Sequence, residues 1–199
     1  MDVKKKLFKV TLFQKKYNLA ILLTEKYANS QNNIKVISVV GTNGKGSVSN
    51  YLQKQLMLNY HRVVIFTSPA FLSHNERIKI NNKVISDKDL KRIIKEIKPE
   101  IKKYQLTFFE IWVLICIKYF LEQKIEIAVI EAGIGGTLDA TNVFNNKLAV
   151  LLTSIGYDHT EVLGNNLESI IQNKVGIVKN NCNLFISASC KKSRLHPKK

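Results

Sequence analysis

The sequence predicts an α/β protein with a mostly parallel, doubly wound sheet, helices on both faces and a single domain. Short continuous apolar runs of strand length alternate with longer stretches whose apolar residues recur at helical spacing. A glycine-rich segment, 41–47, lies between the first such run and the next helical stretch, as in P-loop-containing folds. The 199 residues, 45% of them hydrophobic, are enough to bury one core.

The first part of the chain has the order helix, strand, loop, helix, strand. Residues 17–29 carry apolar side chains at helical spacing, and the apolar run 34–40 follows as a buried strand. Helical spacing resumes over 46–58, and 63–66 is a second strand candidate. This is the order of elements that a nucleotide-binding fold requires.

Two capping signals predict helices in the middle of the chain. Ser86 followed by Asp89 resembles a capping box with aspartate in place of glutamate, and Thr107 with Glu110 repeats the pattern. The first helix should run towards residue 104. The second should run through residue 121 and lie against the sheet, because it is apolar almost all round.

The last part of the chain adds two strands and one helix. Apolar runs at 125–130 and 148–152 are typical of parallel strands that are covered on both faces, and 166–178 is the last helix. We therefore expect a domain over residues 1–190. The lysine-rich tail 191–199 is expected to be disordered.

Composition and charge restrict the partners. The formal charge of +16 favours polyanionic ligands, but the lysines are spread along the chain and no nucleic-acid-binding motif accompanies them. No secretory leader is recognised, and the longest apolar stretch, 111–121, is too short to cross a bilayer. We expect a cytoplasmic protein that binds neither nucleic acid nor membrane.

The glycine-rich segment predicts a phosphate site. Its glycines allow close backbone approach, and the amides at the start of the following helix can bind phosphate oxygens. Lys45 can reach the outer phosphates of ATP, and the Ser47 hydroxyl can help to hold Mg²⁺. The alternative, a flexible turn with a solvated lysine, is disfavoured by the strand before it and the helix after it. The spacing departs from the standard Walker pattern, because Gly41 lies four residues before Lys45 and Gly46 separates Lys45 from Ser47.

A series of motifs resembles folylpolyglutamate synthases/dihydrofolate synthases, which belong to the Mur ligase superfamily. The resemblance begins with Gly-Thr-Asn-Gly-Lys-Gly-Ser at 41–47 and covers nearly the whole chain in family order. The later motifs are Thr-Ser-Pro at 67–69, Asn-Glu-Arg-Ile at 75–78, Thr-Phe-Phe-Glu at 107–110, Glu-Ala-Gly-Ile-Gly-Gly at 131–136, Leu-Asp-Ala-Thr-Asn at 138–142, Thr-Ser-Ile-Gly-Tyr-Asp-His at 153–159, Leu-Gly at 163–164 and Lys-Val-Gly-Ile at 174–177.

The resemblance implies the site residues and the cofactors, ATP and Mg²⁺. Glu131 ends one predicted strand and His159 follows the next, so both should lie at the same edge of the sheet as the phosphate loop. Ser47 and Glu131 are natural oxygen ligands for Mg²⁺, and the family adds the histidine that matches His159. Lys174 matches a lysine that the family carbamylates. The implied catalytic residues are Lys45, His159 and Lys174, and the implied ATP-binding residues are Gly41, Thr42, Asn43, Gly44, Lys45, Gly46, Ser47 and Asn142.

The implied reaction adds glutamate to the carboxylate of a folate or of dihydropteroate through an acyl phosphate, so the partners are small-molecule substrates. Two family positions differ: Ala70 replaces a histidine and Thr137 replaces an arginine. Family members also continue into a C-terminal domain. We therefore expect a truncated chain that is inactive alone or works with a separately encoded C-terminal domain. Two alternatives stay open: an ATP-binding module without ligase activity, and a fragment of a Mur-type ligase.

Overall fold

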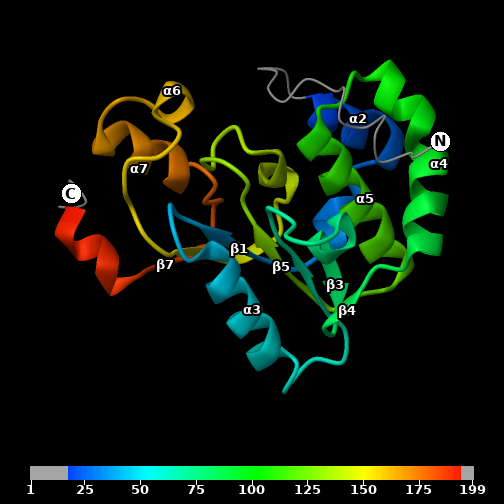
Figure 1. Ribbon diagram of the computed structural model, residues 1–199, viewed down its shortest axis with the longest axis horizontal. Helices are drawn as coiled ribbons and strands as arrows, with labels where there is room; N and C mark the ends of the chain where they lie inside the picture. The colour runs from blue at the N-terminus through cyan, green and yellow to red at the C-terminus, as the bar shows by residue number, and fades with distance from the viewer. Residues whose placement is uncertain (1–17, 194–199) are drawn as a thin grey trace.

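One seven-stranded sheet organises the computed structural model, which describes residues 18–193 (Figure 1). The strands are β1 (Val36–Val40), β2 (Val63–Phe66), β3 (Ile78–Ile80), β4 (Lys83–Val84), β5 (Ile127–Glu131), β6 (Lys147–Leu152) and β7 (Asn183–Ile186). Their spatial order is β4-β3-β2-β5-β1-β6-β7, and every pair from β2 to β7 is parallel. The predicted, mostly parallel sheet is confirmed, with β1 at its interior.

Two short strands at one edge were not predicted. Strand β3 pairs antiparallel with both β2 and β4. Between β3 and β4, Asn81 and Asn82 have φ angles of 45° and 66°, the left-handed conformation that a tight hairpin turn requires. Asparagine tolerates this conformation better than most residues, so the Asn-Asn pair produces a hairpin here.

The helices follow the predicted order closely. The α-helices are α2 (Asn18–Tyr27), α3 (Lys45–Leu56), α4 (Asp87–Lys103), α5 (Phe108–Glu122), α6 (Thr160–Leu163) and α7 (Leu167–Val175). Short 3₁₀ helices are η1 (Ser30–Asn33), η2 (His74–Arg77), η3 (Ala140–Val143) and η4 (Ala188–Ser193). The last α-helix ends at Val175 rather than at residue 178, and the side chain of Ile177 is instead buried against β6 and its neighbours. In the expected tail, 191–193 belong to η4, and 194–199 lie outside the described residues.

Helices cover both faces of the sheet, as predicted (Figure 1). On one face, α3 packs Val48, Leu52 and Leu56 against side chains of β1, β2 and β5. On the other face, α2, α4 and α5 enclose the largest core cluster, which includes Trp112 and Phe120. The central strands are therefore buried on both sides, which explains their continuous apolar sequences.

Helix α5 begins at a complete capping box. The Thr107 side chain accepts a hydrogen bond from the Glu110 amide, and the Glu110 carboxylate accepts one from the Thr107 amide at 2.8 Å. The same carboxylate accepts a bond from the Leu19 amide at 2.9 Å, so it also joins the start of α2 to α5. Most of α5 is buried, as its apolar sequence predicts.

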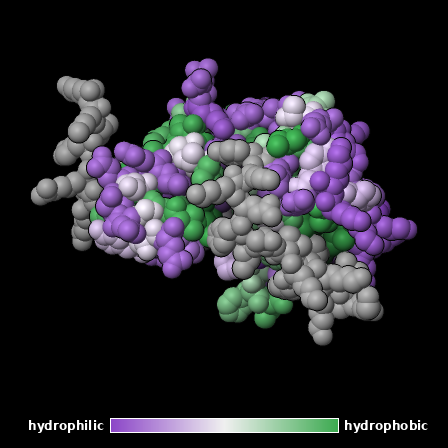
Figure 2. All heavy atoms as spheres, turned by 90° about the horizontal axis from the view of Figure 1, so that it is seen from above, coloured by the Kyte–Doolittle hydropathy of each residue, from purple (hydrophilic) through white to green (hydrophobic). Residues whose placement is uncertain are grey.

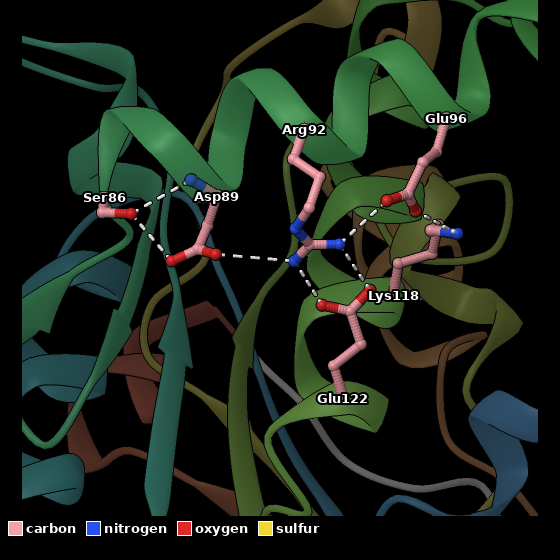
Figure 3. Close-up of polar contacts among 6 residues, drawn as sticks. All are labelled: Ser86, Asp89, Arg92, Glu96, Lys118 and Glu122. Carbon is pink, nitrogen blue, oxygen red and sulfur yellow. Dashed lines mark hydrogen bonds and ion pairs between the residues drawn. The ribbon is translucent and has the colours of Figure 1, made fainter.

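An exposed ion network joins α4 to α5 (Figure 3). The Arg92 guanidinium donates to Glu122 at 2.6 Å and to Glu96 at 2.9 Å, and Lys118 pairs with Glu96 at 3.1 Å. Because these side chains are largely solvated, each pair contributes about 0–1 kcal/mol. The network orients two helices whose stability comes from the apolar core beneath them.

The surplus of lysine faces solvent, and Figure 2 shows hydrophilic side chains crowding the face over α4. The exposed lysines of this helix are Lys88, Lys91, Lys95, Lys98, Lys102 and Lys103. Within residues 18–193, no helix is both long enough and apolar enough to cross a membrane.

Candidate functional site

The glycine-rich loop joins the carboxyl end of β1 to the first turn of α3. Gly41 has a φ of 149°, and a Cβ there would lie 2.0 Å from Thr153 Oγ1. Gly44 has a φ of 82° and precedes the helix without a side-chain cap. The first amides of α3 therefore begin at a glycine turn, which is the arrangement of an anion site at a helix N-terminus.

The segment after β6 supports this loop with several hydrogen bonds. Thr42 Oγ1 both donates to the Gly156 carbonyl and accepts from the Gly156 amide, at 3.2 and 3.0 Å. The Asn43 amide donates to Ser154 Oγ at 2.8 Å, and Thr153 Oγ1 donates to the Asn43 carbonyl at 2.7 Å. The Thr-Ser-Ile-Gly motif thus holds the backbone of the phosphate loop in place.

Two lysines donate to a single carbonyl of the loop. Lys45 Nζ lies 3.1 Å from the Gly41 oxygen and 3.1 Å from the Thr42 oxygen. Lys174 Nζ, from α7, lies 2.9 Å from the same Gly41 oxygen. The family resemblance implied that both lysines belong to one site, and in the structure both donate to this one oxygen.

Burial and charge repulsion both lower the pKa of the Lys174 amine. Its side chain is 2% exposed, and burial lowers the pKa of its amine to about 8, with a further lowering by the charge of Lys45. The carboxylates of Asp158 and Asp139 act in the opposite direction. A substantial fraction of Lys174 is therefore neutral and nucleophilic at a pH near 8.

Glu131, at the end of β5, is an acidic group close to the first turn of α3. Its Oε2 accepts a hydrogen bond from the Ser68 amide at 3.3 Å and lies 3.6 Å from the position of a Cβ on Gly46. Burial raises the pKa of this carboxyl to about 7, although the Ser68 amide and the charge of Lys45 lower it. A buried carboxylate beside Gly46, in the first turn of a helix, is suited to a divalent cation, which would stabilise its ionised form.

The contacts of His159 are made within the segment that follows β6. It follows β6 in a left-handed conformation, with φ 47° and ψ 42°, and its Nε2 lies 3.6 Å from Asp158 Oδ1. Among the residues that the structure describes, no group of three histidine, cysteine or acidic side chains is placed to hold a metal ion. Thus Glu131, at the end of β5, lies beside Gly46, the residue before Ser47 in the first turn of α3, whereas His159 is next to Asp158.

The Asn142 side chain forms its hydrogen bonds with the backbone of its own loop and with Lys147. Its Nδ2 donates to the Thr137 carbonyl at 2.9 Å, and its Oδ1 accepts from Lys147 Nζ at 3.1 Å. The loop also contacts α7, because the Thr137 amide donates to the Asn173 carbonyl at 2.9 Å. No hydrogen bond described within residues 18–193 joins Asn142 directly to the 41–47 segment.

Sequence reasoning missed a group of aromatic and basic side chains near β2. His74 stacks on Trp112 at 5.5 Å between ring centroids, and the Arg77 guanidinium lies over Phe108 at 5.6 Å. The charge of Arg77 acts on the Glu131 carboxyl, so this cluster adjoins the proposed cation site. The cation–π contact joins Arg77 to a residue about 30 positions away, so no local sequence pattern indicates it.

The fold and this site define a nucleotide-binding α/β domain of the P-loop type. The chain belongs to the Mur ligase family, because the Mur ligase middle domain matches residues 39–193.

Individual relatives are more specific. The chain is 37% identical over 164 residues to a Bacillus subtilis protein named dihydrofolate synthase/folylpolyglutamate synthase, covering 79% of this chain and 38% of that protein. It also resembles a solved FPGS–AMPPCP–folate complex, with a TM-score of 0.84, 29% identity and coverage of 92% and 47%. E. coli FolC in complex with DHPP and ADP gives a TM-score of 0.82, 27% identity and coverage of 92% and 44%. The chain thus spans less than half the length of these relatives.

Proposed function

We propose that this chain forms the ATP-binding part of a ligase that adds glutamate to a folate or dihydropteroate carboxylate. The observation that carries the proposal is the meeting of Lys45 and Lys174 at the Gly41 carbonyl, beside the N-terminus of α3 and close to Glu131. Solved relatives of this fold hold AMPPCP with folate, or ADP with DHPP.

The chain's own residues would act mainly by binding and orienting. The loop Gly41–Ser47 and the amides of α3 bind the phosphates, and Lys45 leaves its backbone acceptors to neutralise the transferred phosphoryl group. The substrate carboxylate attacks the γ-phosphate and ADP leaves. The amine of glutamate then attacks the acyl phosphate, forming an amide and releasing phosphate. No protein nucleophile is needed.

We assign Ser47, Glu131 and His159 as the residues that would hold Mg²⁺, which supplies positive charge against the phosphate oxygens. The buried Glu131 carboxyl supports this assignment best. For His159 to take part, its side chain must turn away from Asp158. We also include Asn142 in the proposed ATP site, because its hydrogen bond to the Thr137 carbonyl holds the loop before β6.

Lys174 is proposed to be carbamylated. The neutral amine attacks CO₂, an N–C bond forms and one proton is released, which leaves a carboxylate in place of a cation. The lowered pKa of Lys174 favours this reaction, and its repulsion by Lys45 would become attraction.

The pteridine-bearing substrate is proposed to lie against the cluster of His74, Arg77 and Phe108, which adjoins Glu131. The planar rings and the guanidinium can stack on a fused heterocycle.

We also propose that a C-terminal domain supplies the remainder of the ligase, and that it is a separate polypeptide where this chain stands alone. The complex is proposed to be cytoplasmic. An ATP-binding module without ligase activity is the second candidate, since the contacts of Lys45 and Lys174 with the Gly41 carbonyl concern the nucleotide site alone.

Calorimetry with Mg-ATP tests the binding site. Lys45→Ala should weaken binding by about 10-fold or more, because the variant loses the ammonium group that pairs with the phosphate oxygens in the proposed site. Lys54→Ala, at an exposed position late in α3, is the matched control and should bind like the wild type. Equal affinity of the wild type and the Lys45 variant would refute the assignment.

An ADP-release assay tests the ligase. It combines glutamate with dihydropteroate or a reduced folate, with and without the C-terminal polypeptide of a relative. Glutamate-dependent ADP release supports the ligase. ATP binding without such release under either condition supports the module.

A further inference from the structure

A second buried lysine lies away from the phosphate loop. Lys147 is the first residue of β6 and is only 5% exposed. Its Nζ donates to Asn142 Oδ1 at 3.1 Å and to the Ile177 carbonyl at 2.9 Å. It therefore joins the loop before β6 to the segment that follows α7.

The surroundings of Lys147 favour a neutral amine. A neutral amine has two N–H groups, which matches its two described acceptors, whereas an ammonium has three. Burial lowers the pKa of Lys147 to about 7, and the charge of Lys179 lowers it further. Cys182 and Asp139 oppose this lowering. Such an environment is costly for a cation, and the described role of the side chain is to donate its two hydrogen bonds.

The contacts of Lys147 continue towards the proposed active site. The Asn142 side chain donates through Nδ2 to the Thr137 carbonyl at 2.9 Å. The amide and the hydroxyl of Thr137 both donate to the Asn173 carbonyl, each at 2.9 Å. Asn173 immediately precedes Lys174, whose Nζ donates to the Gly41 carbonyl.

Close packing restricts movement of the loop around Thr137 relative to the end of α7. A Cβ on Gly176 would lie 1.9 Å from Thr137 Oγ1, and a Cβ on Gly136 would lie 2.4 Å from the Lys174 carbonyl. At Gly136 a side chain would collide with the backbone of α7, so the loop packs directly against the backbone at Lys174.

We propose that Lys147 is a positioning residue, which through Asn142 and Thr137 holds the end of α7 so that Lys174 stays at the phosphate loop. The proposal rests on the nucleotide site proposed above. Lys147 itself touches neither the 41–47 segment nor Glu131 in any described contact, and it acts only through the intervening residues.

The first test measures the pKa of the Lys174 amine by ¹⁵N NMR in CO₂-free buffer, with Lys174→Arg to assign the signal. In Lys147→Met, which keeps an apolar stem without a donor, this pKa should move from about 8 towards the usual value for lysine, 10.5, as the side chain leaves its buried position. An unchanged pKa would overturn the proposal. This readout needs no nucleotide, so it decides the matter even if the wild type fails to bind ATP and the proposed function falls.

The second test is a double-mutant cycle on Mg-ATP affinity with Lys147→Met and Asn142→Ala. Each single variant should weaken binding about 3- to 10-fold, and the double variant should be no weaker than the worse single one, because both break one connection. Ile93→Ala, in the core beneath α4, is the control for general destabilisation and should keep the wild-type affinity. Additive losses, or an equal loss in the Ile93 variant, would contradict a positioning role.

Discussion

Glu131 shows how one residue of a candidate site can lower the stability of the chain that carries it. The carboxyl is 3% exposed and has a single described hydrogen bond, from the Ser68 amide, while burial raises its pKa to about 7. An apolar or neutral residue would suit the unliganded fold better. A carboxylate at this point is understandable if a cation compensates for its burial, which is the stability cost commonly found at functional sites.

The raised pKa gives the first stability prediction a definite sign. Between pH 4.5 and about 7 the folded state binds more protons at Glu131 than the unfolded state does, so the free energy of unfolding should fall as pH rises through this window. The slope from this group is at most about 1.4 kcal/mol per pH unit. Glu131→Gln should remove that slope and make the metal-free protein more stable than the wild type at pH 8.

Urea unfolding of both proteins at several pH values between 4.5 and 8, in the presence of a chelator, measures this effect. Glu161→Gln at an exposed position of α6 serves as the control and should leave the pH dependence unchanged. If the Glu131 variant and the wild type have parallel pH profiles, the carboxyl is not the buried acid inferred from its surroundings.

Sequence patterns predicted the phosphate loop and its neighbours at the residue scale, but not the directions of their side chains. The strand-loop-helix order and the ends of the strands indicated that Lys45 and Glu131 lie at one edge of the sheet. The contact of Lys174 with Gly41 joins residues 133 positions apart, and that of Lys147 with the Ile177 carbonyl joins residues 30 positions apart. Periodicity carries no information about such contacts.

Two helices begin with similar sequence signals but differ in their surroundings. In α4, Ser86 Oγ accepts from the Asp89 amide, while the Asp89 carboxylate accepts from the Ser86 hydroxyl instead of completing a capping box. Aspartate is one methylene shorter than glutamate, which explains the incomplete motif. In α5, the motif is complete and buried.

This difference predicts unequal costs for removing the two carboxylates. Glu110→Ala leaves the amides of Leu19 and Thr107 without their acceptor in a buried position, so we expect a loss of about 2–4 kcal/mol in the free energy of unfolding. Asp89→Ala removes an exposed contact and should cost about 1 kcal/mol or less.

Chemical denaturation of the two variants against the wild type gives the comparison directly. Glu110→Gln is an informative third variant, because it keeps one oxygen acceptor and should recover part of the loss. A Glu110→Ala cost no larger than that of Asp89→Ala would mean that burial does not decide the strength of these caps.

Among the elements, long helices and interior strands were predictable, whereas the edges of the sheet were not. The three strands absent from the prediction are β3, β4 and β7, which lie at the two edges. Strands β3 and β4 have only three and two residues, and the apolar run of β7 is limited to Leu184, Phe185 and Ile186, so these strands give a weaker signal than the interior ones. All four residues of β7, Asn183–Ile186, are exposed.

At the scale of the whole molecule, an open apolar edge and a large positive charge act against each other. Phe185 of β7 is 59% exposed, with Leu184 and Ile186 beside it, and no strand beyond β7 is paired with it within residues 18–193. Such an edge can pair with another chain. The formal charge of +16 repels a second copy, and this repulsion weakens when salt screens it.

The chain should therefore self-associate increasingly as salt rises, and Phe185→Lys should reduce that association. The substitution adds a charge to the edge and should change the free energy of unfolding by about 0.5 kcal/mol or less, because the side chain is mostly solvated. Light scattering over a concentration series at low and high salt measures the effect.

The control is Phe71→Lys, which makes the same chemical change at a side chain that is 94% exposed and lies in the loop after β2. If the two variants reduce association equally, net charge explains the result and the edge does not. If only the Phe185 variant does so, the open side of β7 is the surface through which copies of this chain associate.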